Sequence, residues 1–425
     1  MHSWTSPSLS PLPASGLPLR LHDTRTGRVA PQIPLTPGLA RVYVCGLTPY
    51  DATHLGHAAT YHAADLMRRA LRDTGHEVEV AQNITDVDDP LLERATRDGV
   101  DWRDLAASQT ALFAEDMEAL RIIAPETYRS VSESMDGIIE TVSALQARGR
   151  AYQVPTPDAE GEDWYLDLAA DGALGGVSGW SEQQMLAVFA ERGGDPERPG
   201  KRGIFDPLVW RAEREGEPAW DSEVLGRGRP GWHVECVCIA EEGLGLPFDI
   251  QAGGSDLIFP HHDLSAAHAV ALGRGFASTY THSGMVAHDG EKMSKSLGNL
   301  VFVHRLVRDG MDPMTVRLVL MAHHYRADWA WSEDEVALAQ SRLETYRAAA
   351  AAGGHHPRTV EALRAALRED LDTPTALTEL DAWAQALRAV DGSLPVDTSA
   401  PSGPTDAPGD VAAAADALFG LDLRG

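Results

Sequence analysis

The feature that most constrains the fold is a repeated order of strand, polar loop and helix in the first part of the chain. Residues 40–45 (ARVYVC) form a β-branched and aromatic run, a turn-rich segment follows, and residues 57–74 have a helical pattern. Residues 77–82 (EVEVAQ) alternate as a second strand, and residues 83–89 (NITDVDD) form its polar outlet. Two consecutive β-α units predict an α/β fold around a parallel sheet.

The second half of the chain first returns to strands and then becomes helical. Residues 248–251 and 280–286 are strand candidates with polar or Gly-rich outlets, as in open sheets that build a site at strand carboxyl ends. Ala-rich helical patterns follow at 333–352 and 358–390, and a Pro/Ser/Asp/Gly stretch at 392–410 separates them from a last short helix. A small helical domain is therefore expected at the C-terminus.

Composition narrows the classes of function. Of 425 residues, 43% are hydrophobic, yet no run approaches the roughly 20 apolar residues of a membrane span, so a cytoplasmic protein without a membrane partner is predicted. Three cysteines, Cys45, Cys236 and Cys238, are too few for a disulfide framework and suit a metal site better. A formal charge of −27 disfavours tRNA and other polyanions as partners. A monomer is favoured.

Two short motifs have the composition of phosphate-binding elements. THLGH, which contains His54 and His57, stands where the loop after the first strand enters a helix, so backbone N–H groups and imidazoles can face an anion. EKMSKS, which contains Lys292 and Lys295, forms a short loop whose cations can follow a leaving pyrophosphate. Taken singly, the first is also compatible with an ordinary helix start and the second with a solvated basic turn.

In this order and about a domain apart, the two motifs resemble the HIGH and KMSKS signatures of class I aminoacyl-tRNA synthetases. The resemblance implies an α/β fold with a Rossmann-like catalytic domain, ATP bound between the motifs together with Mg²⁺, and an aminoacyl-adenylate as intermediate. It also implies that His54 and His57 hold the phosphates and that Lys292 and Lys295 stabilise the transition state of adenylate formation.

This resemblance divides the chain into five regions. Helical patterns at 102–120 and 132–148 lead into a stretch at 150–230 that is crowded with Gly, Pro and charge, as is typical of an insertion. The predicted regions are an irregular N-terminal lead-in at 1–38, the first half of the catalytic domain at 39–120, an inserted connective region at 121–230, the second half of the catalytic domain at 231–332 and the C-terminal helical domain at 333–425.

Two cysteines and one histidine have the chemistry of a zinc site. Cys45 follows the first strand, Cys236 lies in GWHVEC, and His261 follows a Phe-Pro pair. Three protein ligands leave one position of a tetrahedral Zn²⁺ open, and a substrate thiol fills that position better than a hydroxyl does. Each residue alone is also compatible with simple packing in the core.

The segments around these residues resemble motifs of cysteinyl-tRNA synthetases: CGLTPYD from Cys45, GWHVEC, and GGSDLIFPHH, which contains His261. The resemblance implies one Zn²⁺ held by Cys45, Cys236 and His261. Cys238 is expected to be a core residue or a spare thiol, and the role of His262 is left open. The adenylate pocket is expected to comprise Cys45, Gly46, Leu47, Thr48, Thr60, Asn83, Ile84, Thr85, Trp232, Gly254, Ser255, Asp256 and His288, with Thr48 a candidate for the cysteine amine.

The resemblance to the tRNA synthetases covers residues 42–325 and breaks at three places. Residues 263–265 read DLS where the synthetases usually have Glu-Asn-Glu, Ala58 follows the first motif where a basic residue is usual, and the chain after Ser332 is short for an anticodon-reading module. These features, and ERGGDP at 191–196, resemble the cysteine ligases of mycothiol biosynthesis, which join cysteine to an amine.

The ligase resemblance implies a two-step reaction with L-cysteine, ATP and an aminosugar-inositol acceptor, glucosaminyl-inositol. Arg192 and Asp195 of ERGGDP are candidates for contacting this acceptor. One alternative is a true cysteinyl-tRNA synthetase, which requires a basic face for RNA. A second alternative is a synthetase-like binding protein that has lost turnover, against which the intact His54, His57, Lys292 and Lys295 argue.

Overall fold

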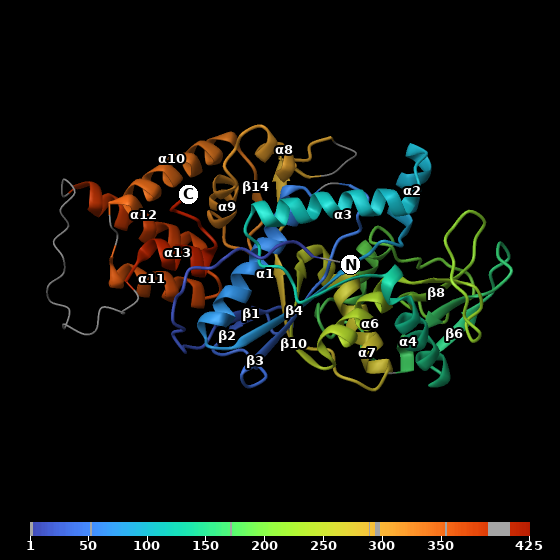
Figure 1. Ribbon diagram of the computed structural model, residues 1–425. Helices are drawn as coiled ribbons and strands as arrows, with labels where there is room; N and C mark the ends of the chain where they lie inside the picture. Colours follow the sequence, from blue (N-terminus) through green and yellow to red (C-terminus); the bar gives the residue numbers. More distant parts are fainter. Residues whose placement is uncertain are drawn as a thin grey trace.

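A parallel five-stranded sheet forms the centre of the molecule (Figure 1). The computed structural model describes residues 3–51, 53–170, 172–288, 290–293, 298–352, 355–389 and 409–425, with the backbone alone at 292, 388 and 389. The strand order is β11-β10-β3-β4-β5, and every neighbouring pair is parallel. The strands are β3 (Leu39–Val44), β4 (Glu77–Ile84), β5 (Thr127–Ser130), β10 (Phe248–Gly254) and β11 (Ala277–Ser283).

The strand order reverses at β3, because the chain places β4 and β5 on one side of it and β10 and β11 on the other. In open α/β sheets a ligand crevice forms at such a point, outside the carboxyl ends of the strands. The predicted α/β, Rossmann-like sheet is therefore present. Its topology predicts a ligand site among the loops that follow β3, β4 and β10.

Alternate residues of β3 serve opposite faces of the sheet. Val42 and Val44 pack in the core that includes helix α1 (Leu55–Asp73), whereas Tyr43 and Cys45 pack in the core that includes helix α6 (Trp232–Leu244). This alternation follows from the two-residue period of a strand, and burial on both faces explains why β3 is apolar except at Arg41. It also turns the Cys45 side chain towards the helix that carries Cys236.

A second sheet, which is antiparallel, belongs to the inserted region. Its strands are β6 (Ala151–Val154), β7 (Asp163–Leu166), β8 (Leu208–Ala212) and β9 (Gly228–Pro230), with α5 (Glu182–Phe189) between β7 and β8. The expected insertion began at residue 121, but β5 lies within that range and pairs with β4 in the central sheet. The antiparallel lobe thus begins at residue 151, after α2 (Asp89–Asp98), α3 (Trp102–Ala119) and α4 (Met135–Ala147).

The N-terminal lead-in is more ordered than its sequence suggests. Strands β1 (Leu21–Asp23) and β2 (Arg28–Ala30) pair as an antiparallel hairpin. Trp4 and Leu19 are buried in the main core, and the Trp4 indole N–H donates to the Ile122 carbonyl at 2.8 Å. Single apolar side chains separated by Pro-rich turns give no periodic pattern, although each of them can be buried.

The remaining elements complete the second half of the catalytic domain and the C-terminal helices. A three-stranded sheet comprises β12 (Val286–His288), β13 (Glu291–Lys292) and β14 (Trp329–Ala330). The helices are α7 (Asp263–Ala271), α8 (Val303–Arg308), α9 (Pro313–Met321), α10 (Glu333–Ala351), α11 (Pro357–Arg368), α12 (Thr373–Ala389) and α13 (Val411–Phe419). None of the helices in the described ranges is long and apolar enough to cross a membrane.

Candidate active site and metal centre

Cys45, Cys236 and His261 converge at one point of the molecule. Cys45 follows β3, Cys236 lies in the second turn of α6, and His261 lies in the turn before α7. All three are buried, and one ligand atom of each lies within 4.8 Å of the others. The sequence separates these residues widely, and the parallel sheet together with the helix on its face brings them together.

The surroundings of this cluster match those of a metal centre. His261 places Nε2 3.2 Å from the Cys236 sulfur and Nδ1 3.0 Å from Nδ1 of His233. The Trp232 ring stacks on the His261 ring with centroids 4.2 Å apart. Metal-binding histidines are commonly oriented by a partner on the other ring nitrogen, and two thiolates with an imidazole are a donor set that Zn²⁺ prefers. The residues therefore fit a zinc ion.

The two sulfurs differ in their acidity. The hydrogen bond with Cys45 lowers the pKa of the Cys236 thiol well below its usual range, whereas burial raises the pKa of Cys45 well above it. Cys236 is therefore the more acidic of the two thiols. A bound Zn²⁺ stabilises thiolates, so it would deprotonate the second sulfur as well.

Two neighbouring residues that the sequence left undecided take different positions. Cys238 faces α4 and lies 3.7 Å from a Glu242 oxygen, so it is a core residue outside the cluster. His262 is not in the cluster either, but its Nε2 lies 3.2 Å from the Cys45 sulfur. Ser265 does not reach the cluster as a ligand, because its hydroxyl donates to the His261 carbonyl at 2.8 Å.

The loops after β3 and β4 are joined by hydrogen bonds. The Gly46 N–H donates to the Asn83 side-chain oxygen at 2.8 Å, and the Asn83 amide donates to the Thr85 hydroxyl at 3.0 Å. The Thr85 N–H in turn donates to the Leu47 carbonyl at 3.0 Å. A Cβ at position 46 would lie 1.6 Å from the Asn83 carbonyl oxygen, so only glycine permits this approach. The predicted adenylate residues Gly46, Leu47, Asn83, Ile84 and Thr85 thus share one edge of the sheet.

Thr48 continues the same edge towards a carboxylate. Its hydroxyl lies 3.4 Å from an Asp88 carboxylate oxygen, and Asp88 also caps the start of α2 by accepting from the Asp89 N–H. Burial raises the pKa of Asp88 to about 6. A carboxylate with this pKa beside Thr48 provides the kind of group that the amine of a bound amino acid requires.

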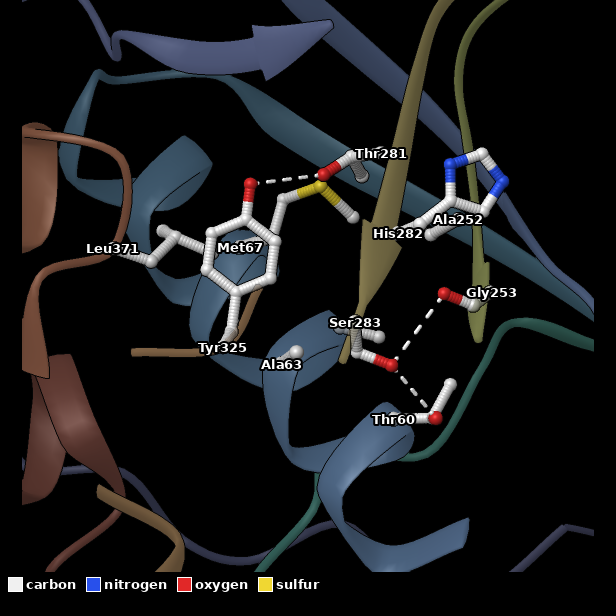
Figure 2. Close-up of a pocket in the computed structure, with 11 residues that line it drawn as sticks. Thr60, Ala63, Met67, Ala252, Gly253, Thr281, His282, Ser283, Tyr325 and Leu371 are labelled. Carbon is white, nitrogen blue, oxygen red and sulfur yellow. Dashed lines mark hydrogen bonds between the residues drawn. The ribbon is translucent and has the colours of Figure 1, made fainter. Parts of the chain in front are cut away.

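Thr60 reaches the ends of β10 and β11 from α1. Figure 2 shows its hydroxyl bonded to the Ser283 hydroxyl, at 2.8 Å, and Ser283 directed towards the Gly253 carbonyl. The pocket that these residues line encloses only about 10 Å³, which is near the lower limit for one water molecule. Thr60 therefore ties α1 to the sheet edge beside Gly254, and this small pocket cannot itself admit a nucleotide.

The segment after the KMSKS motif is joined to the THLGH motif at the start of α1. The His54 and His57 rings stack with centroids 3.9 Å apart, and His54 caps the helix by accepting from the Gly56 N–H at 3.1 Å. The Leu55 N–H donates to the Val301 carbonyl, and the Val303 N–H to the Thr53 carbonyl. The chain that follows the KMSKS motif therefore returns directly to the THLGH motif.

The two ends of the KMSKS loop are also joined. The Asn299 side-chain amide donates to the His288 carbonyl at 3.2 Å, and His288 Nδ1 lies 3.0 Å from the Asn299 carbonyl oxygen. Lys292 belongs to β13, where its backbone alone is described, and Lys295 lies outside the described residues. His288 thus contacts Asn299 across the base of this loop, and its place in the adenylate pocket stays a prediction.

Comparison with known proteins gives consistent matches along the chain. Residues 32–341 match the family described as tRNA synthetases class I (C) catalytic domain. The L-cysteine:1D-myo-inositol 2-amino-2-deoxy-α-D-glucopyranoside ligase of Brachybacterium faecium is 76% identical over 424 residues, which are 100% of both chains. Ligases of the same name from Cellulomonas flavigena and Streptomyces coelicolor are 54% and 51% identical over 428 residues, again 100% of both chains.

The chain belongs to this ligase family. Membership in the family confirms the predictions of a class I synthetase relative and of an ATP-dependent ligase. Methionyl-tRNA synthetase of Mycobacterium tuberculosis, solved in complex with methionyl-adenylate, is 18% identical and covers 81% of each chain with a TM-score of 0.61. At that identity the likeness concerns the fold, and it confirms the predicted Rossmann-like α/β class.

Some residues of the ligase site were not found from the sequence. Gln251 donates to the Cys45 sulfur at 3.3 Å, His233 contacts His261, and Ser283 contacts Thr60. Gln251 and Ser283 lie inside predicted strands, where a polar residue signals nothing unusual, and only the register of the sheet reveals what they face. The sequence signal for His233 was its place in GWHVEC, next to the predicted residue Trp232.

Proposed function

We propose that this ligase joins L-cysteine to the amine of glucosaminyl-inositol in mycothiol biosynthesis, using ATP and forming cysteinyl-adenylate on the way. The observation that carries the proposal is that the Cys-Cys-His cluster lies at the carboxyl end of β3, where the strand order of a class I synthetase sheet reverses. The cluster is chemically suited to a thiol, and the edge is suited to a nucleotide. The full-length relatives named for this reaction support the assignment of the acceptor.

Cys45, Cys236 and His261 would hold Zn²⁺. Bound there, the ion would supply an open coordination position that favours a thiolate over a hydroxyl, which selects cysteine against serine. Trp232 and His233 hold the His261 ring from two directions and so keep its Nε2 directed at the Cys236 sulfur. Selection of cysteine would therefore rest on a rigid cluster and not on the shape of a pocket.

The first chemical step is adenylate formation. A carboxylate oxygen of cysteine attacks the α-phosphorus of ATP, an O–P bond forms, and the bond to the bridging oxygen of the β-phosphate breaks to release diphosphate. His54, His57, Lys292 and Lys295 would stabilise the charge that builds on the phosphates, with Mg²⁺ accompanying ATP. The sheet-edge residues Gly46 to Thr48, Asn83 to Thr85, and Gly254 to Asp256 would hold the adenylate.

The second step transfers the cysteinyl group. The neutral amine of the acceptor attacks the carbonyl carbon, a C–N bond forms, the C–O bond to the phosphate breaks with release of AMP, and the amine loses a proton. Asp88 lies beside Thr48, and its pKa is raised to about 6. Its carboxylate would accept a hydrogen bond from the ammonium of the bound cysteine and so orient the cysteinyl carbonyl for attack by the acceptor amine. The use of ATP is consistent with the predicted cytoplasmic location.

The test is to incubate the purified protein with ATP and L-cysteine and to measure AMP release in two parallel reactions. One reaction receives glucosaminyl-inositol and the other receives bulk tRNA. We expect AMP release and a cysteinyl amide product only with the aminosugar. AMP release and charged tRNA in the second reaction alone would overturn the proposal and favour a cysteinyl-tRNA synthetase. Absence of pyrophosphate exchange with cysteine and ATP would favour a binding protein without turnover.

A further inference from the structure

The loop that carries His261 depends on contacts from outside its own backbone. It spans residues 255–262 between β10 and α7, and within it Phe259 has an extended backbone (φ −137°, ψ 134°) between helical turns. An extended residue interrupts the ladder of backbone hydrogen bonds that would otherwise fix a helix. The position of the His261 imidazole therefore depends on side chains that contact this loop.

Arg192, from the ERGGDP segment of the inserted lobe, makes the most direct of these contacts. Its Nη1 donates to the Asp256 carbonyl at 3.0 Å and to the Phe259 carbonyl at 2.6 Å. Its guanidinium carbon also lies 5.8 Å from the centre of the Trp180 ring. Hydrogen bonds from a charged donor are about twice as strong as neutral ones. A single side chain thus joins the two ends of the segment that precedes His261.

Phe259 is inserted into the apolar core of the same lobe. Its side chain is 0% exposed, and its ring centroid lies 5.8 Å from that of Trp180 and 6.1 Å from those of Phe189 and Phe205. Aromatic clusters at these spacings contribute specific geometry as well as apolar burial. The residue two positions before His261 is therefore held by the inserted lobe and not by the catalytic sheet.

Asp263 provides a second contact on the other side of His261. Its buried carboxylate accepts from the Val177 N–H at 2.7 Å and from the Ser178 N–H at 3.2 Å, both on a loop of the inserted lobe. Arg192 of the lobe donates to carbonyls that precede His261 in the chain, whereas Asp263, which follows His261, accepts from N–H groups of the lobe. The inserted lobe therefore contacts the chain on both sides of His261.

The rest of ERGGDP is explained by the placement of Arg192. Gly193 has a φ of +87°, and a Cβ at Gly194 would lie 2.6 Å from the Phe189 ring. The Asp195 carboxylate accepts from the Lys201 ammonium at 2.7 Å and from the Tyr165 hydroxyl. The two glycines let the chain turn tightly against the end of α5, and Asp195 anchors the turn. In this structure Arg192 and Asp195 contact other parts of the protein, and contact of either residue with the acceptor stays a prediction.

We propose that Arg192 is a positioning residue for His261, through which the inserted lobe holds the metal site in its binding geometry. The inference rests on the proposed zinc site, because it assigns the lobe a role towards that ion. The lobe then has a function in the reaction other than contact with the acceptor: it restricts the ligand loop, whose helical turns are interrupted at Phe259.

The test compares the zinc affinity of the wild-type protein with that of Arg192→Ala and Arg202→Ala, using competition with a chromogenic chelator. Arg202 is the matched control, because it lies in the same lobe, pairs with Asp167 at 3.0 Å and is 60% exposed, without contact to the ligand loop. We expect zinc binding about 10–100-fold weaker in Arg192→Ala, as for loss of other groups that orient metal ligands, and the wild-type value in Arg202→Ala.

Two further readouts distinguish positioning from a general loss of stability. With Co²⁺ in place of zinc, the absorption bands of the tetrahedral thiolate site should weaken in Arg192→Ala, and saturation by L-cysteine should require more ligand. Arg192→Lys keeps a cation that can donate to the two loop carbonyls but loses the guanidinium that lies over the Trp180 ring, so it should bind zinc with intermediate affinity. If Arg192→Ala does not fold, Arg192→Lys takes its place in the zinc-affinity comparison.

The outcomes separate this inference from the proposed function. Zinc binding that Cys236→Ala abolishes, but that Arg192→Ala and Arg192→Lys leave at the wild-type value, would overturn the positioning role alone. Failure of the wild-type protein to bind zinc in a one-to-one ratio would overturn both the zinc site and the inference built on it. Weaker binding in Arg202→Ala as well would assign the effect to lobe stability and so contradict a specific role for Arg192.

Discussion

At the scale of single residues, the cluster of Cys45, Cys236 and His261 is held in place by side chains that are not among its three ligands, such as Gln251 and His233. Sulfur and imidazole ligands are rare enough to be recognised within motifs, whereas Gln251 and His233 are common residue types whose role depends on what they face. Only the register of β10 against β3 turns Gln251 towards the Cys45 sulfur.

The two cysteines of α6 form a natural pair for testing the metal site. Cys236 lies in the cluster and Cys238, two residues later, faces α4 instead. We expect Cys236→Ala to bind zinc more weakly than the wild-type protein, because a ligand itself is removed. The loss of zinc affinity should exceed the roughly 10–100-fold that follows removal of a residue that only orients a ligand. Cys238→Ala should retain one zinc per chain, measured by elemental analysis after dialysis. Equal zinc contents in the two variants would contradict the assigned ligand set.

His268 should make stability depend on pH. Its Nδ1 lies 2.6 Å from the Leu264 carbonyl, and burial lowers its pKa from 6.5 to about 4. Because the unfolded chain binds the proton more readily, stability is complete above pH 6.5 and falls as the pH is lowered towards 4. The difference corresponds to about 3 kcal/mol at pH 4 relative to pH 8.

The measurement compares unfolding midpoints of the wild-type protein and His268→Asn from pH 8 to pH 4. Asparagine can still donate to the Leu264 carbonyl, but it does not titrate in this range. The wild-type protein should lose about 3 kcal/mol more than the variant between pH 6.5 and pH 4. Parallel pH profiles would show that burial of His268 does not contribute to acid sensitivity.

At the scale of elements, strands that are buried on both faces were predicted well and those with weaker patterns were not. The expected strands at 40–45, 77–82 and 248–251 correspond to β3, β4 and β10. β5 has only four residues and was assigned to the insertion, because its position is fixed by pairing with β4 and not by its own pattern. Local sequence is a weak guide where tertiary pairing decides the structure.

The predicted C-terminal helix at 358–390 is in fact two helices. The helical pattern continues through the break, but Asp370 and Leu371 have positive φ values of 53° and 56° and separate α11 from α12. Asp370 accepts hydrogen bonds from the His22 N–H at 2.8 Å and the Tyr325 hydroxyl at 2.9 Å. These partners lie far away in the sequence, so the cost of the left-handed backbone is offset by contacts that no local pattern contains.

A buried carboxylate joins α1 to α9, and the two arginines that it binds also donate to carbonyls of α13. Asp65 accepts from Arg69 Nε at 2.7 Å and from Arg317, and all three side chains are 0% exposed. Burial alone would raise the pKa of Asp65, but the two guanidinium groups hold it well below its usual range. Its contribution to stability is therefore present above about pH 4 and declines as the pH falls further.

Asp65→Asn should destabilise the protein by about 3–5 kcal/mol, because it leaves two buried cations with a neutral partner. The matched control is Asp98→Asn on α2, where the carboxylate is exposed and pairs with Arg94 and Arg97, and where about 0–1 kcal/mol is expected. Guanidinium unfolding midpoints at neutral pH measure both changes. Similar midpoints for the two variants would contradict a bracing role for Asp65.

At the scale of the whole molecule, the net negative charge disfavours polyanionic acceptors. The formal charge is −27, whereas proteins that bind tRNA rely on cations that neutralise phosphates and release counterions. The class I fold is shared with enzymes whose names refer to tRNA, so the fold alone does not decide between acceptors. Net charge and family membership together favour a small aminosugar over a polyanion.

Binding of tRNA therefore provides the sharpest test of this view of the whole molecule. At about 50 mM salt, where electrostatic attraction is strongest, we expect no saturable binding of bulk tRNA up to the roughly 10⁻⁴–10⁻⁶ M range in which even non-specific nucleic-acid binders associate. We also expect tRNA at these concentrations to leave AMP release with glucosaminyl-inositol unchanged. Filter binding and the AMP assay measure the two quantities. Saturable binding that weakens steeply as salt rises would reveal a local basic surface that overcomes the net charge, and it would reopen tRNA as a partner of this fold.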